Sequence, residues 1–177
     1  VHAFTDGRDV DPKSGKQYIQ DLEDFMAPTT AKLASVVGRY YAMDRDKRWE
    51  RVKLAYDLVV NGTGKPTQDA VASIEESYAK DVTDEFIDPL VVVDATNQPL
   101  ATIQAEDVVI FFNFRTDRGR ELTEALSQKD FHEQNMHKLP LYYVTLTNYD
   151  ETYENVKVVY NKDNITQDLG EVVEKAT

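Results

Sequence analysis

The 177-residue chain has no cysteine, which excludes disulfides, thiolate metal sites and thiol nucleophiles, and fits a reducing compartment. It has no apolar run long enough to span a membrane. Basic residues are outnumbered, with 20 Lys and Arg against 32 Asp and Glu, giving a formal net charge of −12. Nucleic acids and anionic membranes are therefore not expected as partners, because binding to them requires a basic face.

The length and the 41% hydrophobic content suffice for one domain with a sizeable core. No linker-like or repeated segment divides the sequence. It begins within a strand-like run, without an initiator Met or a secretory signal pattern. We therefore expect residues 1–177 to form a single domain and to be a fragment of a longer protein.

The arginines are confined to three short stretches, residues 5–9, 38–51 and 113–120, whereas the lysines are scattered along the chain. Arginine presents a rigid fork of donors to a carboxylate or phosphate, while lysine is a flexible point charge. Selective clustering of arginine therefore indicates recognition of an oxyanion. A small anionic ligand is compatible with an acidic protein, because a local arginine pocket can remain positive.

Each arginine stretch follows a run that is typical of a buried strand, at residues 1–4, 33–37 and 108–114. Ligands of open α/β sheets bind beyond the carboxyl ends of the strands, so the three stretches are expected to converge on one anion. Arg115 and Arg118 would also share a face near the N-terminus of a following helix. The alternative is a set of surface arginines paired with the abundant acids, each pair contributing little.

Asp9 is the first acid of interest, because a carboxylate beside Arg8 at a strand end can position a substrate hydroxyl or move its proton. Its alternative role is that of a loop or capping aspartate. Arg48 and Arg51 are expected on the solvated face of a helix, paired with Asp44 or Glu50, and are weighted below Arg39 and Arg45. His132 and His137 lack acidic partners at metal-ligand spacing and are interpreted as surface histidines.

The remaining pattern alternates helices and strands, which predicts a three-layer α/β/α domain with a mostly parallel sheet. Residues 90–93 and 100–103 are expected to form a hairpin that adds an antiparallel portion. The predicted helices are one over 18–26 ending at Pro28, one over 49–59 closed by Asn61 and Gly62, one capped by Thr67 and running through Tyr78, one through Leu122, Ala125 and Leu126, and a short one capped by Thr166. Further strands are expected at 139–146 and 156–160.

Three motifs carry a resemblance to a known family: VHAFTDGRD at residues 1–9, GRYYAMDRDKRWER at 38–51 and VIFFNFRTDR at 109–118. In order and spacing they closely resemble the cofactor-independent, or 2,3-bisphosphoglycerate-independent, phosphoglycerate mutases. The resemblance covers essentially the whole chain. It implies that residues 1–177 are only the inserted substrate-binding domain of such an enzyme.

The resemblance implies specific roles in the interconversion of 3-phosphoglycerate and 2-phosphoglycerate, in cytoplasmic glycolysis and gluconeogenesis. Asp9 would act on the glycerate hydroxyl as acid or base. The substrate's phosphate and carboxylate would be held by Arg8, Arg39, Arg45, Arg115 and Arg118.

The family's other domain, related to alkaline phosphatases, carries two divalent metal ions, with manganese expected, and a serine that is transiently phosphorylated. Neither feature has a counterpart in this sequence, where no metal ligand or other cofactor site is expected. The isolated chain is therefore expected to bind substrate weakly and to be inactive without its partner, the missing domain of the same polypeptide.

Two other functions remain open. A stand-alone regulatory module would bind a phosphorylated metabolite without any partner domain. A structural domain would use its arginines in internal ion pairs, so replacing Arg45 or Arg115 would lower thermal stability rather than ligand binding.

Overall fold

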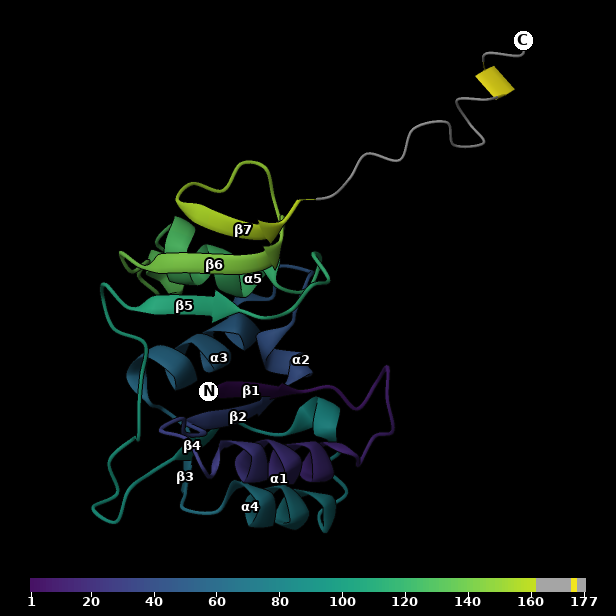
Figure 1. Ribbon diagram of the computed structural model, residues 1–177, viewed down its shortest axis with the longest axis vertical. Coiled ribbons are helices and arrows are strands. Elements are labelled where there is room, and N and C mark those ends of the chain that lie inside the picture. The colour runs from purple at the N-terminus through teal and green to yellow at the C-terminus, as the bar shows by residue number, and fades with distance from the viewer. Residues whose placement is uncertain (162–172, 175–177) are drawn as a thin grey trace.

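The computed structural model describes residues 1–161 and 173–174 (Figure 1). The helix expected after Thr166 lies outside these residues. The strands are β1 His2–Thr5, β2 Ser35–Gly38, β3 Lys65–Thr67, β4 Leu90–Val92, β5 Val108–Phe111, β6 Tyr142–Thr147 and β7 Val156–Tyr160. The helices are α1 Gly15–Met26, α2 Arg39–Ala42, α3 Trp49–Asn61, α4 Ala70–Tyr78 and α5 Arg120–Thr123, which continues as the π-helix η2 Glu124–Gln128. Two 3-10 turns, η1 Asp84–Phe86 and η3 His132–Gln134, complete the described elements.

A four-stranded mixed sheet in the order β1-β2-β4-β3 forms the first part of the fold. Neighbouring side chains of β2 pack on opposite faces of this sheet. Val36 packs with residues of α1 and α4, and Val37 packs with Ala55 and Leu58 of α3. Figure 1 shows α1 and α4 together below this sheet. Because β2 is covered on both faces, all four of its residues are buried, and its sequence shows no alternation of exposed polar and buried apolar positions.

The remaining strands form a second, fully parallel sheet in the order β5-β6-β7. On one face, Phe111 and Tyr143 join residues of α3, α5 and η2 in the largest apolar cluster. The two sheets approach each other where the Phe4 ring packs edge-on against Phe111, with centroids 5.9 Å apart. The predicted α/β class, with parallel and mixed sheets and helices on both sides, is confirmed, and its strands divide into two hydrogen-bonded sheets.

The described residues leave the other face of the second sheet open, and several apolar side chains lie on it. Val108, Ile110, Tyr142 and Val159 are 66%, 62%, 55% and 50% exposed. The first two belong to β5, and Tyr142 pairs with Val108 in register, so these side chains lie on the same face. Parallel sheets are normally covered on both faces, so this surface is unusual for a finished domain.

One local prediction is met in part and another is wrong. Residues 90–103 turn back only briefly: Val93 and Pro99 form one antiparallel bridge, with the Leu100 amide bonded to the Val92 carbonyl and the Asp94 amide bonded to the Gln98 carbonyl. The return goes no further, because Ile103 donates its amide to the carbonyl of Val59, which draws the segment onto α3. The antiparallel portion of the sheet comes from β4, which pairs with β2. The α4 cap is Asp69, which accepts the Ala72 amide at 2.8 Å, rather than Thr67.

Helix α3 agrees closely with the prediction, because it runs from Trp49 to Asn61 and Gly62 follows in the left-handed conformation at φ 63°. At its start, the Trp49 ring packs on Phe131 with centroids 4.0 Å apart. None of the helices among the described residues is long and apolar enough to cross a membrane.

Candidate anion-binding site

The loops that follow β1, β2 and β5 meet at one edge, as the sequence predicts. A continuous series of ion pairs joins them. Arg39 Nη1 contacts Asp6 at 2.5 Å and Asp9 at 2.8 Å, and Asp9 lies 3.7 Å from Arg115. Asp117 then bridges Arg115 at 2.8 Å and Arg45 at 3.0 Å.

The loop after β1 is fixed from beneath by Asp84 of η1. The Thr5 hydroxyl donates to the Asp84 carbonyl at 2.7 Å. Gly7 has φ 63°, and a Cβ there would lie 2.7 Å from the Asp84 Cβ, so only glycine fits this turn. The Asp6 carboxylate accepts the amides of Arg8 and Asp9, which closes the loop and directs Asp9 toward Arg39.

Arg39 is the most buried arginine of the site, with only 4% of its side chain exposed. It follows Gly38 directly, and a Cβ at Gly38 would overlap the Glu85 carbonyl, so the end of β2 packs closely against η1. Burial opposes the charge on Arg39, but its hydrogen bonds with Asp9 and Asp6 outweigh burial and raise its pKa. The Asp6 pKa is lowered, because its bonds with Arg39 and two amides outweigh burial. Arg39 therefore has its counter-ions within the protein.

Arg118 is different, because it forms no ion pair with any described carboxylate. Its Nη1 donates to the Met43 carbonyl at 3.0 Å, and its Nε is buried without a hydrogen-bond partner. Burial lowers the pKa of Arg118, the nearby charges of Arg39, Arg45 and Arg115 lower it further, and the charge of Asp117 opposes the decrease without reversing it. A partly buried guanidinium among three others, with a free donor, is complementary to an anion.

The predicted site residues thus divide into groups. Asp9, Arg39, Arg45, Arg115 and Arg118 are brought together. Arg8 does not join them, because its side chain is 62% exposed and pairs with Glu85 at 3.2 Å. Arg48 and Arg51 pair with Asp44, one of the two expected acids.

The expected helix start at Arg115 and Arg118 is wrong, because α5 begins only at Arg120. Both arginines lie in the preceding loop. Tyr149 helps to hold this loop through its hydroxyl, which donates to the Asn113 carbonyl, and through its own carbonyl, which accepts from Arg120 Nε at 2.7 Å. Gly119 faces the same ring, where a Cβ would lie 2.5 Å from a Tyr149 ring carbon.

Sequence reasoning missed the acids that organise the arginines, namely Asp6, Asp117 and Glu121. Asp6 and Asp117 each stand within one of the three motifs, two residues from Arg8 and Arg115 respectively, and that spacing was the available signal. Glu121 is buried on α5 and accepts the Lys47 amide at 2.7 Å. Its partner is 74 residues away in the sequence, which no local pattern reveals.

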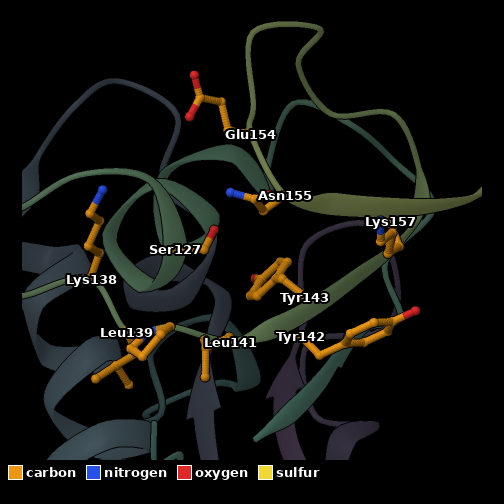
Figure 2. Close-up of a pocket in the computed structure, with 10 residues that line it drawn as sticks. Ser127, Lys138, Leu139, Leu141, Tyr142, Tyr143, Glu154, Asn155 and Lys157 are labelled. Atoms are coloured by element: carbon orange, nitrogen blue, oxygen red, sulfur yellow. The ribbon is translucent and has the colours of Figure 1, made fainter. Parts of the chain in front are cut away.

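A hollow of about 640 Å³ lies elsewhere, near the amino ends of β6 and β7 (Figure 2). Its walls include Tyr143, Ser127 and Lys138, and Figure 2 shows the Glu154 carboxylate pointing away from Tyr143. The arginines lie at the opposite, carboxyl ends of the strands, where ligands of α/β sheets bind. The hollow therefore belongs to a different part of the surface from the candidate site.

One group of possible metal ligands occurs among the described residues. Asp130, His132 and His137 are exposed, and their donor atoms lie within 4.8 Å of one another. The prediction that these histidines lack an acidic partner is wrong, since Asp130 approaches His137 Nδ1 at 3.9 Å. Three exposed ligands do not form a two-metal centre, and the arginine edge would repel cations.

Parallel and mixed sheets with helices on both sides, and loops that gather arginines at one edge, define the class of the molecule as an α/β domain. Residues 1–151 match the family described as BPG-independent PGAM N-terminus (iPGM_N). The chain therefore belongs to the 2,3-bisphosphoglycerate-independent phosphoglycerate mutase family, in agreement with the resemblance of its motifs.

Relatives with that name are 78% identical in Flavobacterium johnsoniae and 76% identical in Flavobacterium psychrophilum, each over 99% of this chain. The chain spans 35% of the length of both, or about a third. A crystal structure of Leishmania mexicana phosphoglycerate mutase at low cobalt concentration is similar over 94% of this chain and 32% of that chain. Its TM-score is 0.85 at 31% sequence identity.

Proposed function

We propose that residues 1–177 are the single substrate-binding domain of an enzyme that interconverts 3-phosphoglycerate and 2-phosphoglycerate. In this proposal the arginine edge holds the phosphate and carboxylate of the substrate. The observation that carries this proposal concerns Arg118. Its buried Nε has no hydrogen-bond partner, and its guanidinium forms no ion pair with a described carboxylate. A charged donor left in this state would gain a strong hydrogen bond once a shift of the loop brought it against an anion.

Arg45 and Arg115 would form the adjustable part of the site. Both are about half exposed, at 48% and 55% of their side chains, and both contact Asp117. An incoming phosphate can compete with Asp117 for these two guanidinium groups, because exposed ion pairs are weak. Arg8, which is exposed at the end of the same loop as Asp9, would complete the grip if it left Glu85.

Asp9 would act on the glycerate hydroxyl as acid or base. Its carboxylate contacts Arg39 at 2.8 Å and lies 3.7 Å from Arg115, so it stands within the ring of arginines. A hydroxyl of a ligand held by Arg115 and Arg118 would come within reach of this carboxylate. Such fixed placement of reacting groups is the main contribution that a binding domain makes to phosphoryl transfer.

The remaining chemistry is assigned to the rest of the polypeptide. The serine nucleophile and two divalent ions, manganese by the family resemblance, would lie there, since the described residues do not fit such a centre. The isolated chain would then bind substrate weakly and be inactive. The family assignment also favours a glycolytic role in the cytoplasm.

The open face of the second sheet supports this assignment. An apolar parallel sheet requires a second cover, and curated relatives carry about twice as much additional chain as is present here. We infer that the rest of the same polypeptide packs on this face. Limited proteolysis or hydrogen exchange of the full-length protein should show β5 and β6 protected, and an exposed face there would contradict the inference.

The proposed function is tested by the kinetics of the full-length protein and its Arg118→Gln variant. The KM for 3-phosphoglycerate should rise roughly 10- to 100-fold, as expected for one lost charged hydrogen bond. Lys65→Gln is the matched control. Lys65 lies on the outer strand β3 and pairs with Glu76 of α4, and its replacement changes the net charge by the same amount. Equal KM values for the two variants would refute the proposed site.

The structural alternative has support at one residue. Arg39 is buried between Asp6 and Asp9, so its ion pairs stabilise the junction of the first two loops. Arg39 can serve both as a support and as part of the positive field. A stand-alone regulatory module would bind 3-phosphoglycerate with useful affinity in the absence of the remaining chain, and calorimetric titration of both forms separates this alternative from the mutase.

A further inference from the structure

Glu121 occupies an unusual position between the two loops that carry Arg45, Arg115 and Arg118. It lies one residue into α5, directly after the second loop, and only 5% of it is exposed. Its Oε1 accepts the backbone amide of Lys47 at 2.7 Å. Its Oε2 is buried and accepts no hydrogen bond from the described residues.

The turn that Glu121 holds is built around a second buried acid. Asp44 is 4% exposed and accepts the amides of Asp46 at 2.9 Å and Arg48 at 3.0 Å. Lys47 adopts φ 59°, a left-handed conformation that is costly for a residue with a side chain. The Glu121 contact fixes this residue in place, two positions after Arg45.

We propose that Glu121 is a positioning residue, whose buried carboxyl holds the turn over residues 44–48 and thereby sets Arg45 against the loop of Arg115 and Arg118. The proposal rests on the proposed function for its link to substrate binding. The structural part, a carboxyl that fastens one arginine loop to the other, is independent of the ligand.

The proton on Glu121 is expected to control this contact. Burial raises the pKa of Glu121 to about 7, and the Lys47 amide opposes the increase. The charge of Asp44, a hydrogen bond that the protonated Glu121 can make with Asp44, and the charge of Glu124 add to it. The Asp44 pKa is lowered despite burial, chiefly by the Arg48 and Asp46 amides, so Asp44 remains ionised beside Glu121.

The other charged groups facing this pair are Arg48 and Arg51, and both are already paired with Asp44. Below about pH 7 a neutral Glu121 therefore fits beside the Asp44 carboxylate. Above that pH two buried carboxylates oppose each other, and the turn should loosen.

The test uses the full-length protein and its Glu121→Gln and Glu121→Ala variants. Glutamine keeps an acceptor for Lys47 and imitates the neutral acid at every pH. Hydrogen exchange of peptides over residues 43–48 is compared without ligand at about pH 6 and pH 8, each variant against the wild type at the same pH, so that the intrinsic pH dependence cancels. The KM for 3-phosphoglycerate is measured at the same two values.

The wild type should resemble Glu121→Gln at the lower pH and lose protection at the higher pH. From the lower to the higher pH, the ratio of the wild-type KM to the Glu121→Gln KM should rise by up to roughly tenfold, which is the effect of one weakened polar contact. Because both proteins are measured with the same substrate at each pH, the effect of substrate phosphate titration on KM cancels in this ratio. In Glu121→Ala, peptides over residues 43–48 should exchange rapidly and the KM for 3-phosphoglycerate should be high at both pH values.

Equal exchange of the wild type and Glu121→Gln at both pH values would overturn the proposal, even if substrate binding behaves as proposed above. An exchange difference without a change in the KM ratio would overturn the positioning of Arg45. A normal KM for Arg118→Gln refutes the proposed function instead and leaves the exchange result intact, so the two failures are distinguishable. If Glu121→Ala does not fold, the Glu121→Gln comparison alone decides.

Discussion

Arg39 and Arg118 lie in the same cluster, the first buried and the second partly buried, yet their surroundings are opposite. Arg39 is held by Asp6 and Asp9, and its pKa is raised. Arg118 has a backbone carbonyl and three neighbouring arginines, and its pKa is lowered. The same side chain therefore serves two purposes at one edge: Arg39 closes the protein on itself, and Arg118 keeps a charge available.

This difference shows why clustering of arginine alone does not define a binding site. An arginine whose charge is already balanced contributes mainly to stability, while an unbalanced one contributes to ligand binding at some cost to stability. The following experiments test whether the two residues can be separated in this way.

Replacing Arg39 by glutamine should have the largest effect on stability. It removes both internal bonds and leaves Asp6 and Asp9 facing each other, so the free energy of unfolding should fall by about 3 kcal/mol. Urea denaturation measures this loss. Lys65→Gln should change the free energy by at most about 0.5 kcal/mol, because its pair is exposed. A similar small change for Arg39→Gln would remove the contrast with Arg118.

Replacing Arg118 by glutamine should leave the free energy of unfolding unchanged or slightly higher, because it relieves repulsion among four arginines. Affinity for inorganic phosphate or 3-phosphoglycerate should fall instead, roughly 10- to 100-fold. Denaturation and calorimetric titration of the same variant measure both quantities. A stability loss as large as that of Arg39→Gln would show that Arg118 is structural as well.

The acid dependence of stability should differ between the wild type and Arg39→Gln. The Asp6 pKa is lowered in the folded state, so its contribution is complete above the unfolded value of about 4 and is lost as pH falls through the folded value. Removing Arg39 brings the folded pKa of Asp6 closer to its unfolded value. The free energy of unfolding should then fall less steeply as the pH is lowered. Denaturation between about pH 2 and pH 6 tests the expectation, and parallel curves would contradict it.

The Asp117→Asn variant should have the smallest effect. Asp117 is the shared counter-ion of Arg45 and Arg115, and these contacts lower its pKa despite burial. Without its charge the two arginines should bind an anion slightly more tightly, by roughly two- to fivefold, with little change in stability. A weaker affinity would mean that Asp117 orients the arginines rather than competing for them.

Helices and the meeting of the arginine loops could be predicted from the sequence, because both depend on local patterns. Helix α3 shows an apolar stripe, a Gly62 terminator and the expected end. For β1 and β2 the convergence follows from the general geometry of parallel strands. The loop after β5 joins them from the second sheet, a placement that depends on how the two sheets pack. The ends of the strands were less accessible: the apolar run at 108–114 predicts a strand to Phe114, whereas β5 stops at Phe111 and Phe112 is 78% exposed.

The counter-ions were beyond sequence reasoning, for a physical reason. An acid two residues from an arginine can pair with it, with a distant arginine or with water, and only tertiary packing decides. Asp9 pairs with Arg39, 30 residues later, rather than with the adjacent Arg8. The same holds for Glu121, whose raised pKa arises from burial that no local pattern indicates.

The stacking of Trp49 on Phe131 has a practical consequence. This is the protein's only tryptophan, and it begins α3 immediately after the turn of residues 44–48. Indole emission responds to changes in its aromatic and charged neighbours, which here include the Lys129 ammonium at 5.7 Å. The chain therefore contains its own optical reporter, and stopped-flow fluorescence can follow that turn in real time without an attached dye.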